Sequence, residues 1–223
     1  MSYMGVSFKN NEEQTELVRL IYENNIPIVF CTGKAGTGKT FTALAAALQL
    51  QAEHRYGKII YARNPVQLGE DMGFLPGDLE DKYIPFMGPL KDNLESIARI
   101  GNKSEGKKSR NANELEEHIE CTPIAFLRGR SFENTILIID EAQNLDLVAL
   151  KACLTRFGRF CKVILLASLN QIDNRLQNRQ GPCDFEKVLN KLKDKPYVGY
   201  VELKNSMRSD VCTEIDDLLG EIK

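Results

Sequence analysis

The sequence has no long hydrophobic run, no Cys-x-x-Cys pair and almost no excess of charge of either sign. Because no apolar stretch approaches the roughly 18 residues of a membrane span, we expect neither a transmembrane helix nor a signal peptide. Six scattered cysteines favour free thiols in a reducing compartment over a disulfide or zinc framework. A net charge of −2 gives no strong overall attraction to nucleic acid. We therefore expect a cytoplasmic protein without a membrane partner.

Residues 1–223 are predicted to form one α/β domain. This length suits a single domain with a sizeable core, and the chain shows neither internal repeats nor a linker. Five apolar runs alternate with helical patterns, at residues 26–31, 58–62, 135–140, 162–167 and 198–203. The runs are continuous rather than alternating, as in strands covered on both faces. These features predict a three-layer sandwich around a mainly parallel sheet.

Helical patterns fill the intervals between these runs. Residues 40–50 follow the first run, and residues 145–157 follow the third, with one apolar face made of Leu147, Leu150, Leu154 and Phe157. A closing helix is marked by Val211, Ile215, Leu218 and Ile222. Residues 63–134 break the alternation because they carry Gly, Pro and charge without a clear strand. Within this insertion-rich region, residues 101–113 are expected to form a mobile, mildly basic loop.

A phosphate-binding loop is the clearest motif. Residues 33–40, GKAGTGKT, fit G-x-x-x-x-G-K-[ST] at every fixed position, between a predicted strand and a predicted helix. Glycines let backbone N–H groups turn toward phosphate oxygens, and the following helix presents its positive end to them. Lys39 is expected to contact the β- and γ-phosphates, and Thr40 to ligate Mg²⁺. The predicted nucleotide-binding residues of the loop are Gly33, Lys34, Ala35, Gly36, Thr37, Gly38, Lys39 and Thr40.

The stretch ILIIDEAQ supplies the second half of a P-loop site. Four apolar residues bury the strand, and Asp140 emerges where a carboxylate would stabilise hydrated Mg²⁺. Glu141 is the natural base for an attacking water. An Asp-Glu pair after a strand is a weak signal alone, but it is strong about 100 residues after a matching phosphate loop.

The stretch ILLASLNQID (164–173) leads from a buried strand to polar side chains that have three interpretations. Asn170–Asp173 looks like the Asn-Lys-x-Asp with which GTPases read guanine. However, those GTPases carry Asp-x-x-Gly where this chain has Asp-Glu-Ala-Gln, which favours the RecA and helicase branch. There the strand at 162–167 would insert between the phosphate-loop strand and the Asp140 strand, and Gln171 would sense the γ-phosphate. The third interpretation is a structural strand end.

The longer motifs resemble those of the PhoH-like family, the phosphate-starvation-inducible ATPases, over roughly residues 10–222. The most specific pieces are GKAGTGKT, GFLPGDLEDK (73–82), IAFLRGRSFENTILIIDEAQN (124–144), LTRFG (154–158), NQID (170–173) and MRSD (207–210). The resemblance implies a RecA-like P-loop ATPase that binds ATP and Mg²⁺ and forms a ring, with a hexamer favoured. The chain departs from the family pattern in three places. Ser168 stands where Asp is usual, and the stretch IGNKSEGKKSRNAN (100–113) is lengthened and polar. RNPVQLGE (63–70) shifts the usual Arg-Pro start, so a nucleic-acid contact by Arg63 is not carried over from the family.

Two further positions bear on nucleotide choice and on catalysis. Gln14 lies 19 residues before Gly33, where related ATPases carry a Gln that reads the Hoogsteen edge of adenine; a solvated surface Gln is the alternative. We therefore expect ATP to be preferred over GTP. Arg208 is the candidate to stabilise the transferred phosphoryl group from a neighbouring subunit. Arg128 and Arg130 are candidates for a subunit interface or for internal ion pairs.

Mg²⁺-dependent ATP hydrolysis is the leading functional hypothesis. Its predicted catalytic residues are Lys39, Glu141, Gln171 and Arg208, and its predicted metal ligands are Thr40 and Asp140. A nucleic-acid remodeller is one alternative, in which a ring would replace the second RecA-like domain of monomeric helicases. A P-loop kinase is another, which Glu141 disfavours because it suits water as acceptor. RNA or DNA could contact the local basic cluster, Lys103, Lys107, Lys108 and Arg110, although a solvated loop fits equally. The expected host is a bacterium or the bacterial host of a phage.

Overall fold

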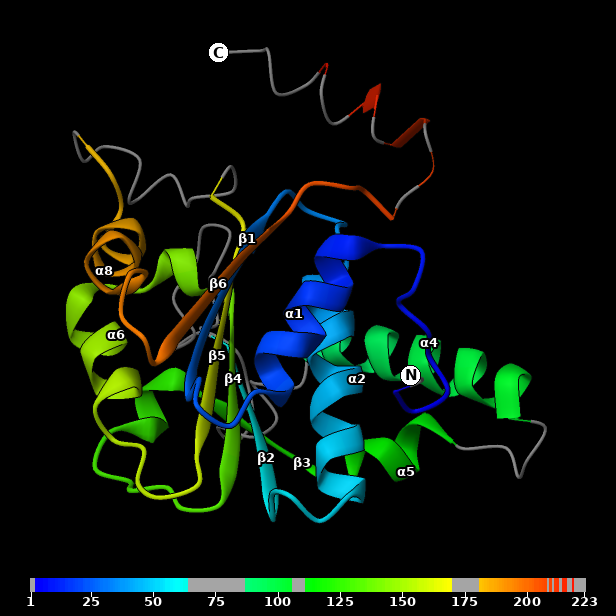
Figure 1. The fold of residues 1–223 in the computed structure, drawn as a ribbon, viewed down its shortest axis with the longest axis horizontal. Helices are drawn as coiled ribbons and strands as arrows, with labels where there is room; N and C mark the ends of the chain where they lie inside the picture. The colour runs from blue at the N-terminus through cyan, green and yellow to red at the C-terminus, as the bar shows by residue number, and fades with distance from the viewer. Residues whose placement is uncertain are drawn as a thin grey trace, which may run out of the picture.

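The computed structural model describes residues 3–63, 87–105, 111–169 and 181–207, together with residues 209, 211, 212, 214, 215 and 218. Its centre is a sheet of six parallel strands in the order β3-β2-β4-β5-β1-β6. Helices cover both faces, as Figure 1 shows, so the predicted three-layer α/β sandwich is confirmed.

Five of the strands are those expected from the apolar runs. They are β1 (Ile28–Gly33), β2 (Lys58–Arg63), β4 (Thr135–Asp140), β5 (Lys162–Ala167) and β6 (Val198–Leu203). All six residues of β4 and of β5 are buried, because helices cover both sides. Strand β5 pairs with both β1 and β4, which confirms the insertion expected for the RecA and helicase branch.

Side chains of the central strands alternate between two hydrophobic cores. In β1, Val29 and Cys31 belong to one core, and Ile28 and Phe30 belong to the other. This period of two follows from the pleat of a strand, whose successive side chains point to opposite faces. Continuous apolar runs are therefore required here, because neither face of the central sheet meets water.

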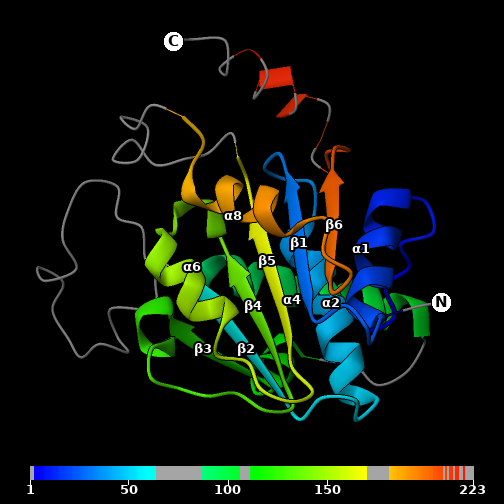
Figure 2. The ribbon, with the colours of Figure 1, turned by 60° about the vertical axis from the view of Figure 1, so that its left-hand side comes forward.

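One layer consists of α1 (Glu12–Tyr22), α2 (Lys39–Ala52), α4 (Gly88–Glu105) and α5 (Ala112–Glu116), on the same side of the sheet in Figures 1 and 2. Helix α2 is buried almost all round, and residues Ala43 to Ala47 have no exposed surface. Its alanine content suits this position, because small side chains allow close packing and favour the helix. The helix that follows the phosphate loop is thus held firmly inside the domain.

The opposite layer consists of the short 3₁₀ helices η3 (Ile124–Leu127) and η4 (Ala142–Asn144), together with α6 (Leu147–Leu154) and α8 (Asp184–Leu192). The helix predicted over 145–157 is shorter because Asp146 caps its start, accepting a bond from the N–H of Ala149. Leu147 was expected on the buried face but is 54 % exposed, since the first turn of α6 lies at the edge of the sheet where β4 ends.

The region 63–134 contains more regular structure than the sequence indicated. A sixth strand, β3 (Ile119–Pro123), pairs with β2, and α4 and α5 precede it. The expected absence of a strand is wrong because β3 is an edge strand, whose half-exposed Glu120 and Cys121 interrupt the apolar pattern. The loop predicted at 101–113 is wrong at both ends, because residues 101–105 belong to α4 and Asn111 caps α5; residues 106–110 lie outside the described ranges.

All six cysteines are free thiols, as predicted, although Cys212 is exposed. Burial raises the pKa of Cys31 and of Cys121 to about 12, which leaves these thiols protonated and unreactive at neutral pH. In the described ranges, no helix is long and apolar enough to cross a membrane. At the predicted closing helix, the described residues are helical, and Val211, Ile215 and Leu218 are exposed.

Candidate nucleotide-binding site

A cleft of about 580 Å³ lies where the parallel strands end. This is the edge at which open α/β sheets bind ligands. Its walls are formed by the phosphate loop, the strand ends, α4 and the segment after β6. The residues that line it are Ala35, Gly36, Gly38, Lys39, Thr40, Phe41, Arg63, Pro89, Asn93, Ser96, Arg99, Ile100, Asp140, Glu141, Ser168 and Met207. Most residues predicted for the phosphate and metal site are therefore brought together.

The phosphate loop has the backbone that an anion cradle needs. Gly36 and Gly38 both adopt left-handed conformations, with φ of 76° and 83°. A Cβ on Gly38 would also lie 2.5 Å from Nε2 of Gln14, so this position has no room for a side chain. Gly38 provides no side-chain cap for α2, and the start of a helix is a favourable position for an anionic ligand.

Lys39 is folded over the loop that it is expected to serve. Its side chain is mostly buried, and Nζ donates hydrogen bonds to the carbonyl oxygens of Gly33 at 2.9 Å and Lys34 at 2.8 Å. The ammonium group is therefore held at the floor of the cleft, at the start of α2. A phosphate bound there would meet a positioned positive charge.

Three groups from different elements orient the Asp140 carboxylate. Oδ1 accepts bonds from Thr40 Oγ1 at 3.2 Å and from the N–H of Glu141 at 3.1 Å. Oδ2 accepts a bond of 2.5 Å from the hydroxyl of Tyr61, a buried residue of β2. Burial, followed by the nearby Asp140 carboxylate, raises the pKa of Tyr61 well above its ordinary value, so its hydroxyl remains a donor.

The Thr40–Asp140 pair fits a hard cation such as Mg²⁺. Both side chains offer oxygen atoms, and they face each other beside the phosphate loop. Mg²⁺ in nucleotide sites takes one or two protein oxygen ligands and completes its shell with phosphates and water. The described ranges hold no group of three or more His, Cys, Asp or Glu side chains that could bind a metal unaided. The donor set thus suits a cation that arrives with a nucleotide.

The conformation of Glu141 is fixed by its backbone and by hydrogen bonds to its side chain. It has a left-handed conformation, φ 53° and ψ 40°, which is uncommon outside glycine and typical of functional sites. Its Oε2 accepts a 2.5 Å bond from Nε2 of the fully buried Gln143. Oε1 of Gln143 in turn accepts a 2.9 Å bond from the N–H of Ser168, just after β5. Gln143 thus connects the Glu141 carboxylate to the end of the neighbouring strand.

Arg63 enters the same cluster from the end of β2. Its guanidinium lies 3.8 Å from the Glu141 carboxylate. Burial disfavours its charge, but Asp140, Tyr61 and Glu141 together hold the pKa of Arg63 above its ordinary value. The structure therefore places Arg63 beside the predicted base.

Gln14 is not a solvated surface residue. It is buried on α1, and its Nε2 donates a 3.1 Å bond to the carbonyl of Thr37 in the phosphate loop. This amide donor therefore serves the conformation of the loop. Reading an adenine edge with both donor and acceptor would require this bond to be exchanged, and that role remains a prediction.

Several predicted residues lie outside the described ranges. These are Gln171 and the rest of Asn170–Asp173, the candidate arginine Arg208, and the basic residues Lys107, Lys108 and Arg110. Arg130, by contrast, forms an internal ion pair with Glu120 at 2.6 Å and lies over the ring of Phe132. Of its two predicted roles, the internal ion pair is the one observed.

Tyr61, Gln143 and the wall formed by α4 are parts of the site that no sequence motif predicted. Gln143 was visible as the last letter of Asp-Glu-Ala-Gln, but its buried position depends on contacts with β5. Tyr61 looked like an ordinary strand residue. The α4 wall contributes Asn93, Ser96 and Arg99, and no motif marked these positions.

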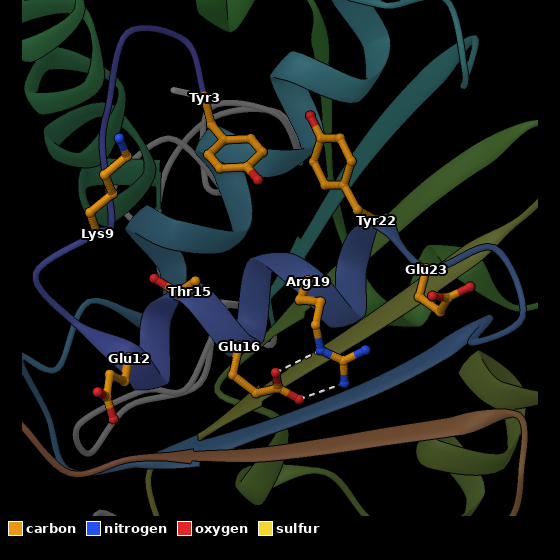
Figure 3. Close-up of a pocket in the computed structure, with 8 residues that line it drawn as sticks. All are labelled: Tyr3, Lys9, Glu12, Thr15, Glu16, Arg19, Tyr22 and Glu23. Atoms are coloured by element: carbon orange, nitrogen blue, oxygen red, sulfur yellow. Dashed lines mark hydrogen bonds and ion pairs between the residues drawn. The ribbon is translucent and has the colours of Figure 1, made fainter. Parts of the chain in front are cut away.

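A second groove, of about 640 Å³, lies along the outer side of α1 (Figure 3). Arg19 and Glu16 within it form two hydrogen bonds of 2.7 Å, so these charges neutralise each other. The bond from Arg19 lowers the pKa of Glu16. No residue of the phosphate loop lines this groove. The smaller cleft is therefore the candidate nucleotide site.

Comparison with known proteins places the chain in a family. A family model described as PhoH-like protein matches residues 7–219. Protein PhoH2 of Bacillus subtilis is 38 % identical over 212 residues, covering 94 % of this chain and 47 % of that protein. Protein PhoH of Escherichia coli K12 is 33 % identical over 205 residues, covering 91 % and 55 %. The chain spans about half the length of these curated relatives.

Solved structures give weaker likenesses. Pif1 helicase from Candida albicans is 17 % identical with a TM-score of 0.45, covering 94 % of this chain and 43 % of that chain. The flagellar accessory protein FlaH from Methanocaldococcus jannaschii is 13 % identical with a TM-score of 0.34, covering 68 % of this chain and 66 % of that chain.

The family match extends over nearly the whole sequence and includes the phosphate loop and the Asp140–Glu141 strand end. The chain belongs to the PhoH-like family, with the fold of a P-loop nucleoside triphosphatase.

Proposed function

We propose that this chain binds ATP with Mg²⁺ and hydrolyses it. The observation that carries the proposal is the convergence of Lys39, the Thr40–Asp140 pair and Glu141 on one cleft. In this assignment, the loop backbone and Lys39 bind the phosphates. Thr40 and Asp140 hold the cation, which would supply positive charge to the transferred group.

Glu141 orients the attacking water and accepts its proton. A carboxylate in this role must lie near the γ-phosphate end of the site, and Glu141 follows directly after the cation ligand Asp140. Gln143 and Arg63 position the carboxylate by contacting its two oxygens separately.

Phosphate release from ATP tests the proposed activity. The parent protein should release phosphate only when Mg²⁺ is present. Lys39→Ala should lose both MgATP binding and turnover, because the phosphates lose their buried positive contact. Lys187→Ala, which removes an exposed lysine on α8, is the matched control and should behave like the parent. Parent-level turnover by Lys39→Ala would exclude this cleft as the active site.

Assembly and coupling to a polymer are further parts of the proposal. Family resemblance supports a ring, and an exposed Lys103 near the end of α4 is a described member of the basic cluster. Turnover should be measured with and without RNA or DNA on protein whose mass in solution is known. Stimulation by a polynucleotide would favour the remodeller, whereas phosphate transfer to a metabolite would favour a kinase.

A further inference from the structure

Met207 is an apolar side chain fixed at the mouth of the cleft. Its backbone N–H donates a 2.8 Å hydrogen bond to the carbonyl of Gly36 in the phosphate loop. Its side chain lines the cleft and is 63 % exposed. A large apolar group is thus held in solvent by a backbone bond to the loop that is expected to bind phosphate.

The surroundings of Met207 link it to the start of α1. Atoms of Met207 and of Gln14 both lie against Gly38, because a Cβ there would be 3.5 Å from Cγ of Met207 and 2.5 Å from Nε2 of Gln14. Nδ2 of Asn11 also donates to the sulfur of Met207 at 3.9 Å. Asn11 caps α1 through its Oδ1, one turn before Gln14. Met207 is therefore positioned from two sides.

A second apolar group lines the cleft from α2. Phe41 directly follows the cation ligand Thr40 and is partly exposed, and its ring meets Phe8 edge-on at 6.1 Å. The charged groups of the cleft, by contrast, come from Lys39, the strand ends and α4. The cleft therefore offers an apolar surface for a planar ring in addition to its sites for phosphate.

We propose that Met207 binds the face of the base of a bound nucleoside triphosphate, with Phe41 as a further apolar contact. This inference rests on the proposed nucleotide binding and adds the position of the base. A thioether is polarizable and makes favourable contacts with aromatic rings. It contacts the face of a base and not its edge, so it binds adenine and guanine alike. Any preference for ATP must then come from an edge contact such as Gln14.

The test compares nucleotides with a ligand that has no base. Affinities for MgATP, MgGTP and magnesium tripolyphosphate are measured by calorimetry on the parent and on Met207→Ala. The variant should bind ATP and GTP weaker by the same factor, roughly two- to tenfold as for other sulfur–aromatic contacts. Its affinity for tripolyphosphate should equal that of the parent. Met207→Leu retains apolar volume and should lose less, and Tyr197→Ala removes a remote exposed ring as the control.

Three results would overturn the proposal. Equal weakening of all three ligands would show that Met207 shapes the phosphate loop, and unchanged nucleotide affinity would place the base elsewhere. If the parent protein bound ATP no tighter than tripolyphosphate, the base would contribute nothing to affinity. The proposed phosphate site would then stand, but the proposed contact of Met207 with the base would be wrong. A parent that binds none of the ligands would refute the proposed function itself, which makes the two failures distinguishable.

Discussion

At the scale of single residues, Gln143 explains how a buried amide can control a partly exposed carboxylate. Its Nε2 donates a hydrogen bond to the Glu141 carboxylate, and its Oε1 accepts one from the backbone N–H of Ser168, just after β5. Hydrogen bonds to charged groups contribute about 1.5–3 kcal/mol, and a small misplacement of a catalytic group can cost about 100-fold in rate. Gln143 is therefore a positioning residue for the proposed base.

Gln143→Met should lower the single-turnover rate roughly 10- to 100-fold and leave MgATP affinity nearly unchanged, because only the orientation of Glu141 is lost. A double-mutant cycle tests this directly. In a Glu141→Gln background, Gln143→Met should cause no further loss. Gln51→Met, at an exposed amide of α2, is the matched control. Additive losses in the cycle would contradict a role that acts through Glu141.

The roles of single residues could be predicted from the sequence where those residues belong to a short motif. Lys39, Thr40, Asp140 and Glu141 were all assigned from motif spacing, and the structure brings them to one cleft. Tyr61 and Met207 were not assigned, because their contacts with Asp140 and Gly36 join positions far apart in the chain. Such contacts depend on the register between strands, which no local pattern specifies.

At the scale of elements, a buried lysine fixes the end of α1. Lys162, the first residue of β5, is almost fully buried, and its Nζ donates to the carbonyls of Leu20, Glu23 and Ile26 at 3.3, 2.7 and 2.8 Å. The first two carbonyls lie at the C-terminal end of α1, where positive charge is favourable, and the third lies in the segment between α1 and β1. Burial nevertheless lowers the pKa of Lys162 to about 8.

This pKa predicts a specific dependence of stability on pH. The ordinary pKa is 10.5, so between about pH 8 and 10.5 the unfolded chain binds a proton that the folded chain has released. The contribution of Lys162 to the free energy of unfolding should therefore rise through this range, by on the order of 3 kcal/mol. Because other groups also titrate there, the quantity to measure is the difference between the parent and Lys162→Met in urea unfolding at several pH values.

The exposed lysine variant Lys187→Met is the control for this experiment. It is unfolded over the same pH range, and its difference from the parent is the reference for Lys162→Met. A difference between the parent and Lys162→Met that does not change with pH would contradict the lowered pKa of Lys162. Variants at this site should also leave nucleotide affinity unchanged, since Lys162 begins β5 and the cleft lies where the strand ends.

Elements with continuous apolar patterns were predicted within about two residues, whereas β3 and α4 were missed. β3 is short, half-exposed and ends in Pro123, so it lacks the pattern of a buried strand. The sequence of α4 begins with Gly and Pro and carries polar residues on the face that lines the cleft. These features suggest a loop when the fold is unknown.

At the scale of the whole molecule, the proposed ring predicts that subunits share active sites. Arg63, Arg99 and Met207 line the cleft within one chain. Arg208 is the proposed contribution from a neighbour, which requires two adjacent clefts to lie close together at the subunit interface. Mixing equal amounts of Arg208→Ala and Lys39→Ala protein should restore up to about a quarter of parent activity, because random assembly pairs an intact Lys39 with an intact neighbouring arginine at that frequency.

Arg63→Ala provides the matched control for subunit mixing. Arg63 and Lys39 line the same cleft of one chain, so a mixture of Arg63→Ala and Lys39→Ala should be no more active than the average of the two variants measured separately. Recovery only in the Arg208 mixture would support a shared site. An inactive Arg208 mixture with verified subunit exchange, or full activity of a parent monomer, would contradict it.

The central claim is that Glu141 activates water for hydrolysis of an ATP held by the rest of the cleft. It is tested most directly by measuring MgATP affinity and single-turnover hydrolysis on the same samples of parent and Glu141→Gln protein. The account predicts nearly equal affinities and hydrolysis slower by roughly 10²–10⁴-fold in the variant. Hydrolysis by Glu141→Gln at the parent rate would contradict the account.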